Sequence, residues 1–212
     1  MNEEQILEML ENREYKELKI ELEKMYPVDL AELLEEFDEK QRIIVFRLLS
    51  KESAADTFTY LNSDMREVLI NALTDSEIKE VMDEMYLDDT VDVLEEMPAN
   101  VVDRLLMVTD EETRKQINEL LQYPEDSAGS IMTAEYIGLK KNMTVEQSFA
   151  YIRRNAVDKE TIYTCFVIDE KRHLEGIVTV KDLLLNDYST KLEDIMDTNI
   201  IQAVTTDDQE AV

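Results

Sequence analysis

The sequence holds very few of the residues on which covalent cross-links and transition-metal sites depend. Its 212 residues include one cysteine, one histidine and no tryptophan. A single thiol excludes an internal disulfide, and a zinc site is excluded for want of a thiolate or imidazole cluster. Cys165 lies in the apolar run 163–168, which predicts a buried strand with a structural thiol. A nucleophilic role is disfavoured because His173 is the only histidine available to activate it.

Glycine, proline and long apolar runs are scarce as well. With three glycines and three prolines, long irregular loops are not expected and helices should dominate. No apolar run approaches the roughly 18 residues that a membrane helix needs. The acidic N-terminus carries no signal-peptide pattern. As given, the chain is therefore expected to be soluble and intracellular.

Basic residues are outnumbered by acidic residues. The chain has 22 Lys and Arg against 50 Asp and Glu, a formal net charge of −28. Such a surface repels phosphate backbones, so nucleic acid is not an expected partner. It attracts cations, but charge alone favours the simpler interpretation that an acidic surface keeps the protein soluble. Apolar residues make up 44% of the chain, enough for a folded core.

The acidic charge is concentrated in the first part of the chain. Residues 1–127 hold 35 acids and 13 bases, whereas residues 128–212 hold 15 and 9. Pro124 and Gly129 interrupt the pattern where the charge changes. We therefore predict one domain over residues 1–127, a second over 128–198, and the start of a truncated third over 199–212.

Residues 1–127 predict a repeat of short helices. Residues typical of helix starts recur about every twelve positions, at Asp38, Ser50, Asn62, Thr74, Tyr86, Pro98 and, close to register, Thr109. Capping boxes are expected where Glu or Gln follows three residues later, at Asp38, Thr74 and Thr109. Helices of about nine residues are marginal alone in water. They must stack, which predicts an all-α superhelical repeat domain.

The second part changes period. A helix is predicted from Thr144 to about Asn155, followed by strands at 164–168 and 176–179 and a short helix at 180–185. These elements form a β-α-β-β-α unit if a strand precedes the first helix. The predicted fold class is thus α+β and multi-domain: an all-α repeat domain followed by an α/β domain.

One stretch of the helical part is exceptionally acidic. Residues 75–100 carry ten acids and a single base, Lys79. Asp88 and Asp92 are four residues apart and so share a helical face, where like charges repel unless a cation lies between them. Magnesium prefers oxygen ligands and retains several waters, so a few carboxylates suit it. A solvated helix face is the alternative interpretation of the same acids.

Several motifs resemble known families. Residues 131–133, 143–145, 166–169 and 176–183 match the pattern of a CBS domain, and 192–196 resembles the entry to a second copy. The acidic segments 27–36 and 88–96 and the junction 123–129 are similar to MgtE-type magnesium transporters. This resemblance covers essentially the whole chain. One departure is Ser130, where the family usually has glycine; a ligand that is the main-chain carbonyl would survive it.

The resemblance implies a function and a set of ligands. In MgtE transporters a helical N-domain and a CBS pair precede a dimeric membrane pore, and magnesium bound between the domains closes that pore. The chain is then expected to be a magnesium-sensing region on the cytoplasmic side of the cell membrane, homodimeric through its CBS domains and not an enzyme. The implied magnesium ligands are Asp56, Asp88, Asp92, the Ser130 carbonyl, Asp208 and Glu210.

Two other functions remain open from the sequence. Thr179 and Asp182 match CBS positions where a hydroxyl meets phosphate and a carboxylate meets ribose, so an adenine-nucleotide sensor is one alternative. A protein-interaction scaffold is the other, since short-helix repeats also resemble a flagellar motor switch protein. Catalysis has no support, because no nucleophile–base pairing or phosphate loop is present.

Overall fold

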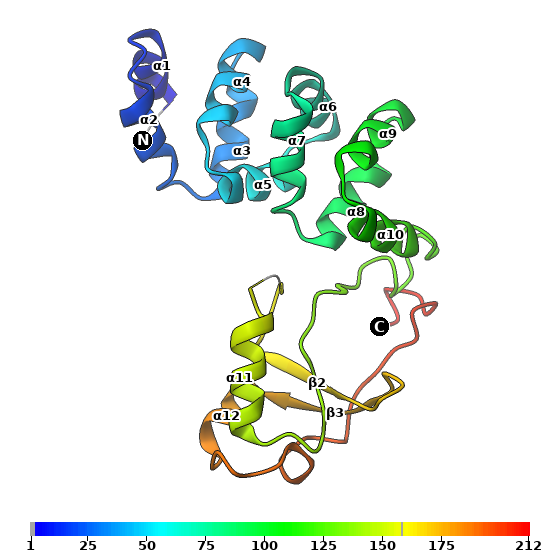
Figure 1. Ribbon diagram of the computed structural model, residues 1–212. Coiled ribbons are helices and arrows are strands. Elements are labelled where there is room, and N and C mark those ends of the chain that lie inside the picture. Colours follow the sequence, from blue (N-terminus) through cyan, green and yellow to red (C-terminus); the bar gives the residue numbers. More distant parts are fainter. Residues whose placement is uncertain (1–2, 158) are drawn as a thin grey trace. The chain divides into compact units, whose positions relative to one another are not determined.

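The chain divides into two compact units between Leu121 and Gln122. The computed structural model describes residues 3–157 and 159–212. The first unit is built from helices, and the second combines helices with a small sheet (Figure 1). The predicted fold class, an all-α repeat domain followed by an α/β domain, is confirmed by this architecture.

The described part of the first unit holds ten short helices, each of eight to ten residues. They are α1 (Glu3–Glu11), α2 (Tyr15–Leu22), α3 (Pro27–Glu36), α4 (Glu39–Leu48), α5 (Lys51–Tyr60), α6 (Ser63–Ala72), α7 (Asp75–Met82), α8 (Leu87–Glu95), α9 (Ala99–Val108) and α10 (Glu111–Leu120). Among these described residues, no helix has the length and apolar character needed to cross a membrane.

The predicted helix starts are confirmed at six of seven positions. Asp38, Ser50, Asn62 and Thr74 accept a hydrogen bond from a main-chain N–H of the first turn, and Tyr86 and Pro98 occupy the same N-cap position. The capping boxes at Asp38–Gln41 and Thr74–Glu77 are both present.

The seventh helix start was predicted wrongly. Thr109 ends α9, and its hydroxyl donates to the carbonyl of Leu105. Asp110 is the N-cap of α10 instead, accepting from the N–H groups of Glu112 and Thr113. Threonine is a good N-cap residue, but the buried Thr109 hydroxyl already donates to a carbonyl of α9.

Alternate helices pack on one another. In one series α3 contacts α5, α5 contacts α7 and α7 contacts α9, while α2, α4 and α6 form a second series and α8 packs on α10. Figure 1 shows the helices of this unit as successive coiled ribbons, coloured from blue to green. Buried leucines and isoleucines such as Leu34, Leu69, Ile78 and Leu105 fill the space between them. Stacking therefore supplies the stability that such short helices lack alone.

Arginine side chains close the ends of several helices. Arg42 donates to the carbonyls of Leu34 and Phe37, Arg66 to those of Phe58 and Thr59, and Arg114 to that of Thr109. The arginines are separated by 24 and 48 residues. Because each closes the helix before its own, the structural repeat is a pair of helices, twice the twelve-residue period of the helix starts.

The second unit is a β-α-β-β-α arrangement. Its elements are β1 (Gly138–Leu139), α11 (Val145–Asn155), β2 (Thr164–Ile168), β3 (Leu174–Thr179), α12 (Val180–Leu185) and a 3-10 turn (Leu192–Asp194). The strands lie in the order β1-β2-β3, with β1 parallel and β3 antiparallel to β2. Thr144 caps α11 as predicted. The strand predicted at 176–179 is β3, which begins two residues earlier, at Leu174.

One face of this sheet packs against the two helices. Leu139, Val167 and Val178 are fully buried there with Ile152 and Leu183. Cys165 belongs to the same core, which confirms the predicted buried thiol, and burial raises its pKa to about 11. A thiol held protonated in this way is a packing group and a poor nucleophile.

Candidate functional site

The acidic candidates of the first unit lie on two helices. Asp56 lies in α5, whereas Asp88 and Asp92 lie in α8. Glu96 follows at the C-terminal end of α8, so that three carboxylates at intervals of four residues form one row along the helix. We call Asp88, Asp92 and Glu96 the acidic row. It lies opposite buried residues such as Val91 and Leu94, which anchor the helix to the core.

The carboxylates of the acidic row repel one another. The pKa of Asp92 is raised, first by partial desolvation and then by the charges of Asp88 and Glu96, while Arg66 acts in the opposite direction. The pKa of Asp56 is also raised, by desolvation and by Glu52 one helical turn away. Ionising these groups therefore costs free energy that a bound cation would recover.

Several of the ten acids in residues 75–100 form ion pairs with bases. The ion pairs are Asp75–Arg104, Glu77–Arg47, Glu80–Lys51, Asp83–Lys79 and Glu96–Arg66, with N···O distances from 2.6 to 3.3 Å. Four of the five bases come from outside the segment, which the sequence did not indicate.

The pair formed by Asp88 and Asp92 fits a hydrated divalent ion better than a closed cage. Among the described residues, no three or more His, Cys, Asp or Glu side chains converge as a metal site. Magnesium, however, is usually bound through one or two carboxylates and keeps several waters. One oxygen of Asp88, Oδ1, is buried, whereas Asp92 is exposed. The donor set is hard oxygen throughout, as Mg²⁺ requires.

The remaining candidates lie together in the second unit. Ser127 and Asp208 pair as an isolated antiparallel bridge, and the N–H of Ala128 donates to the Asp207 carbonyl at 2.7 Å. Ser130 is tied into the same turn through its N–H and hydroxyl, which donate to Ser127. The Asp208 carboxylate accepts from the N–H of Glu210 at 2.9 Å.

Two residues of this region were missed by the sequence reasoning. The Asp126 carboxylate accepts from the side chain of Gln209 at 2.7 Å, which helps to hold the C-terminal segment in place. Gly129 allows the close approach of the two segments, because a Cβ there would lie 2.6 Å from the Tyr123 ring and 2.8 Å from the Thr205 carbonyl. The order of these residues in the sequence gives no sign of either contact.

Thr179 and Asp182 form the capping box of α12. The Thr179 hydroxyl donates to Asp182 Oδ2 at 2.5 Å and accepts from the Asp182 N–H at 3.1 Å. The Asp182 carboxylate also accepts from the Thr179 N–H at 2.9 Å. The pKa of Asp182 is lowered by its two hydrogen bonds from Thr179, first the one from the hydroxyl and then the one from the N–H. The two residues that were assigned to phosphate and ribose thus have a structural role at the start of a helix. Neither is fully buried.

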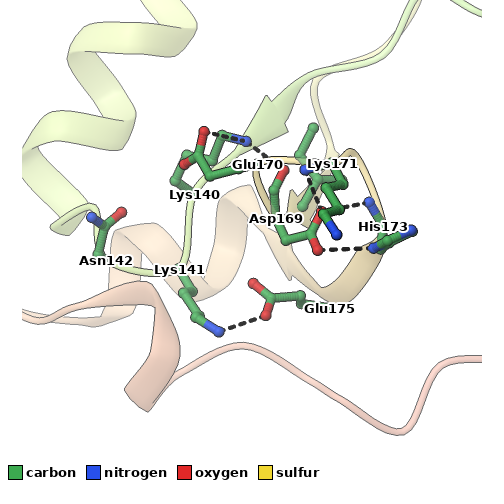
Figure 2. Close-up of a pocket in the computed structure, with 9 residues that line it drawn as sticks. Lys140, Lys141, Asn142, Asp169, Glu170, Lys171, His173 and Glu175 are labelled. Carbon is green, nitrogen blue, oxygen red and sulfur yellow. Dashed lines mark hydrogen bonds and ion pairs between the residues drawn. The ribbon is translucent and has the colours of Figure 1, made fainter.

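A separate pocket of about 460 Å³ lies at the other end of the strands (Figure 2). Lys140 donates to the Asp169 carbonyl at 2.6 Å, and Lys141 pairs with Glu175 at 2.5 Å. The Asp169 carboxylate accepts from the N–H of His173 and contacts its ring, and its pKa is lowered chiefly by that main-chain hydrogen bond. These contacts hold the β2–β3 turn, and none of the candidate ligands lies here.

Two family models match the chain. The model described as the MgtE intracellular N domain matches residues 25–126, and that of the CBS domain matches residues 128–188. The magnesium transporter MgtE of Thermus thermophilus is 35% identical over 209 residues, covering 97% of this chain and 46% of that protein. MgtE of Bacillus subtilis is 28% identical over 207 residues. The chain spans a little under half the length of these curated relatives.

Solved structures agree with this similarity. The cytosolic domain of the Mg²⁺ channel MgtE in complex with ATP superposes with a TM-score of 0.93 at 33% identity, covering 99% of this chain and 86% of that one. The soluble part of a magnesium transporter gives a TM-score of 0.88 at 29% identity, covering 99% and 82%.

Proposed function

The chain belongs to the MgtE family of magnesium transporters, and from this premise we propose that it is a magnesium-sensing regulatory region. The observation that carries the proposal is the Asp88–Asp92 pair on α8, inside the part matched by the MgtE N domain. Its carboxylates share one face of α8, and the charge of Asp88 contributes to the raised pKa of Asp92. Binding a divalent cation there relieves a repulsion that is built into the fold.

We propose two groups of ligands. Asp56, Asp88 and Asp92 belong to the first unit, and the Ser130 carbonyl, Asp208 and Glu210 belong to the second. Each group offers only oxygen atoms, and the hydrogen bonds between residues 126–130 and 205–209 support a common location for the second group. Magnesium supplies the positive charge that lets such acidic groups approach one another.

The proposed mechanism is an electrostatic switch between two arrangements of the units. At low magnesium the acidic surfaces repel, and at high magnesium a compact arrangement is favoured. Moving such an equilibrium from 1:99 to 99:1 takes about 5.5 kcal/mol of differential binding. A site present only in the compact form contributes about 1.4 kcal/mol at ten times its Kd. Two such sites supply about 2.8 kcal/mol, so the full shift requires about four, as two groups of ligands in each chain of a homodimer would provide.

In the full-length protein the compact arrangement would close a membrane pore. We propose that this pore follows the region in the same chain, as in a transporter of this family, and that the region lies on the cytoplasmic side of the membrane. A homodimer formed through the CBS domains would couple two such regions to one pore. The role is regulatory rather than catalytic.

A magnesium titration followed by small-angle X-ray scattering tests the switch. The radius of gyration should fall as Mg²⁺ rises through the millimolar range, at constant ionic strength set with KCl. Asp88→Asn combined with Asp92→Asn should shift the midpoint to higher Mg²⁺ or abolish the change. Asp103→Asn, which removes an exposed charge from α9, is the matched control. An unchanged radius, or the same response in the double variant, contradicts the proposal.

Nucleotide binding is a second candidate function. It is favoured by the similar chain that was solved in complex with ATP, and Thr179 and Asp182 are the residues we propose for it. Calorimetric titration with ATP should show binding that Asp182→Asn weakens by about tenfold or more, since hydrogen bonds to a charged group are worth about 1.5–3 kcal/mol. Absence of binding by the wild-type chain, or an unchanged affinity in the variant, would exclude this function.

A further inference from the structure

Arg66 lies where the acidic row ends. Its side chain is buried, with 7% of the residue exposed. The guanidinium donates to the carbonyls of Phe58 and Thr59 at the end of α5, at 3.2 and 2.6 Å. A third hydrogen bond, of 2.7 Å, joins it to Glu96 Oε2. The positive charge is therefore fixed in position by one helix and directed at the acidic row of another.

We propose that Arg66 is an internal counter-ion that competes with Mg²⁺ for the acidic row and holds the affinity of the row low. The inference rests on the proposed function, because it takes Asp88 and Asp92 to be magnesium ligands. In this proposal Arg66 is not a ligand. It sets the Mg²⁺ concentration at which the acidic row binds the ion.

The geometry favours an electrostatic role over a positioning role. Asp88 and Asp92 belong to the same helix, so their spacing is fixed by α8 and does not depend on Arg66. Glu96 is one turn from Asp92 and would add a third negative charge to the row if it were not paired. A sensor of a cation that is abundant inside cells needs weak binding, and a fixed arginine weakens binding without removing a ligand.

The direction of the effect follows from where the charges lie. Arg66 is hydrogen-bonded to Glu96 at 2.7 Å, and Glu96 is one helical turn from Asp92. A divalent ion at the Asp88–Asp92 pair would therefore lie near a fixed positive charge that repels it. A fixed unit charge about two helical turns from a divalent ion at the surface changes its affinity by about three- to tenfold.

The two partners of this one ion pair give opposite predictions. Arg66→Gln removes the competing charge and leaves Glu96 unpaired, so Mg²⁺ should bind about three- to tenfold more tightly. Glu96→Gln removes an acid and leaves the arginine uncompensated, so Mg²⁺ should bind more weakly by a similar factor. A purely structural ion pair would move affinity in the same direction in both variants, because both break the same contact.

The experiment is isothermal titration of the full chain with Mg²⁺, together with thermal unfolding in EDTA. Arg66→Lys keeps the charge and loses the forked hydrogen bonds, so its unfolding midpoint should fall while its affinity stays near that of the wild type. Arg42→Gln is the matched control: it breaks the same kind of cap on α3, away from α8, and should lower the midpoint without changing the affinity.

The possible outcomes distinguish a failure of the counter-ion proposal from a failure of the proposed function. Tighter binding by Arg66→Gln with weaker binding by Glu96→Gln supports the counter-ion. Unchanged or weaker binding by Arg66→Gln overturns it, and leaves the proposed function standing if Asp88→Asn with Asp92→Asn still abolishes binding. No binding by the wild-type chain overturns both. Should Arg66→Gln fail to fold, Glu96→Gln decides alone, since the Glu96 side chain is 58% exposed; tighter or unchanged binding by it contradicts the proposal.

Discussion

At the scale of the residue, the surroundings of Asp92 make its ionisation unfavourable. Its raised pKa comes from desolvation and from two carboxylates on the same helical face. The sequence predicted the repulsion between Asp88 and Asp92 from their spacing alone. It could not predict the effect of Arg66, because that residue lies 26 positions from Asp92 in the chain (92 − 66) and meets the acidic row only after folding.

Asp92→Asn should make the magnesium-free chain more stable. A carboxylate whose folded-state pKa is raised contributes stability only below its unfolded pKa, and that contribution is lost as the pH rises through the folded pKa. At neutral pH the substitution removes two repulsive contacts, which together are worth about 0.5 kcal/mol and shift the unfolding midpoint upward by about 1–3 °C.

Thermal unfolding in EDTA at pH 7 and at pH 3.5 measures this effect. The gain should shrink at the lower pH, because a raised pKa makes wild-type Asp92 take up a proton at a higher pH than an ordinary aspartate does. Asp103→Asn removes a charge from α9 and serves as the control. A lower midpoint for Asp92→Asn at pH 7 would show that this carboxylate stabilises the chain.

At the scale of the element, capping decides where each helix begins. Short side chains with an oxygen close the starts of α4, α5, α6, α7 and α10. Their twelve-residue recurrence made most starts predictable. The exception is Thr109, which lies one residue before the twelve-residue register. The register falls on Asp110, which caps α10, while the Thr109 hydroxyl donates to the Leu105 carbonyl.

Thr74→Ala should destabilise the first unit through α7. It removes the hydroxyl that accepts from the Glu77 N–H, and losing such a cap costs about 1 kcal/mol. Thr74→Ser keeps the hydroxyl and should remain close to the wild type. Circular dichroism during thermal unfolding distinguishes the two variants, and equal midpoints for both would show that the cap contributes nothing.

The capping box formed by Thr74 and Glu77 also makes the stability of the first unit depend on pH. The pKa of Glu77 is lowered, first by the hydrogen bond that the Thr74 N–H donates and also by Arg47. A lowered folded-state pKa gives stability that is present above the unfolded pKa and is lost as the pH falls toward the folded one. The Thr74 hydroxyl also donates to the Glu77 carboxylate at 2.9 Å and contributes to this lowering of the pKa, and Thr74→Ala loses that bond. The difference in stability between Thr74→Ala and the wild type should therefore narrow as the pH falls below the ordinary glutamate pKa of about 4.3.

At the scale of the whole molecule, a net charge of −28 is tolerated because bases are placed between helices. Arg47, Lys51, Arg66 and Arg104 each pair with an acid about thirty positions along the chain, on another helix. Each exposed pair is worth little alone. Together they place positive charge where helices meet and neutralise part of the acidic surface there.

The sequence by itself determined the local features of this protein. The helix starts, the β-α-β-β-α order and the burial of Cys165 follow from spacing, capping chemistry and apolar periodicity, which act over a few residues. Only the tertiary structure decided which acids are held by bases, that Asp126 and Gln209 meet, and that Arg66 faces the acidic row. These contacts join residues far apart in the chain, and their energies depend on distances that no local pattern encodes.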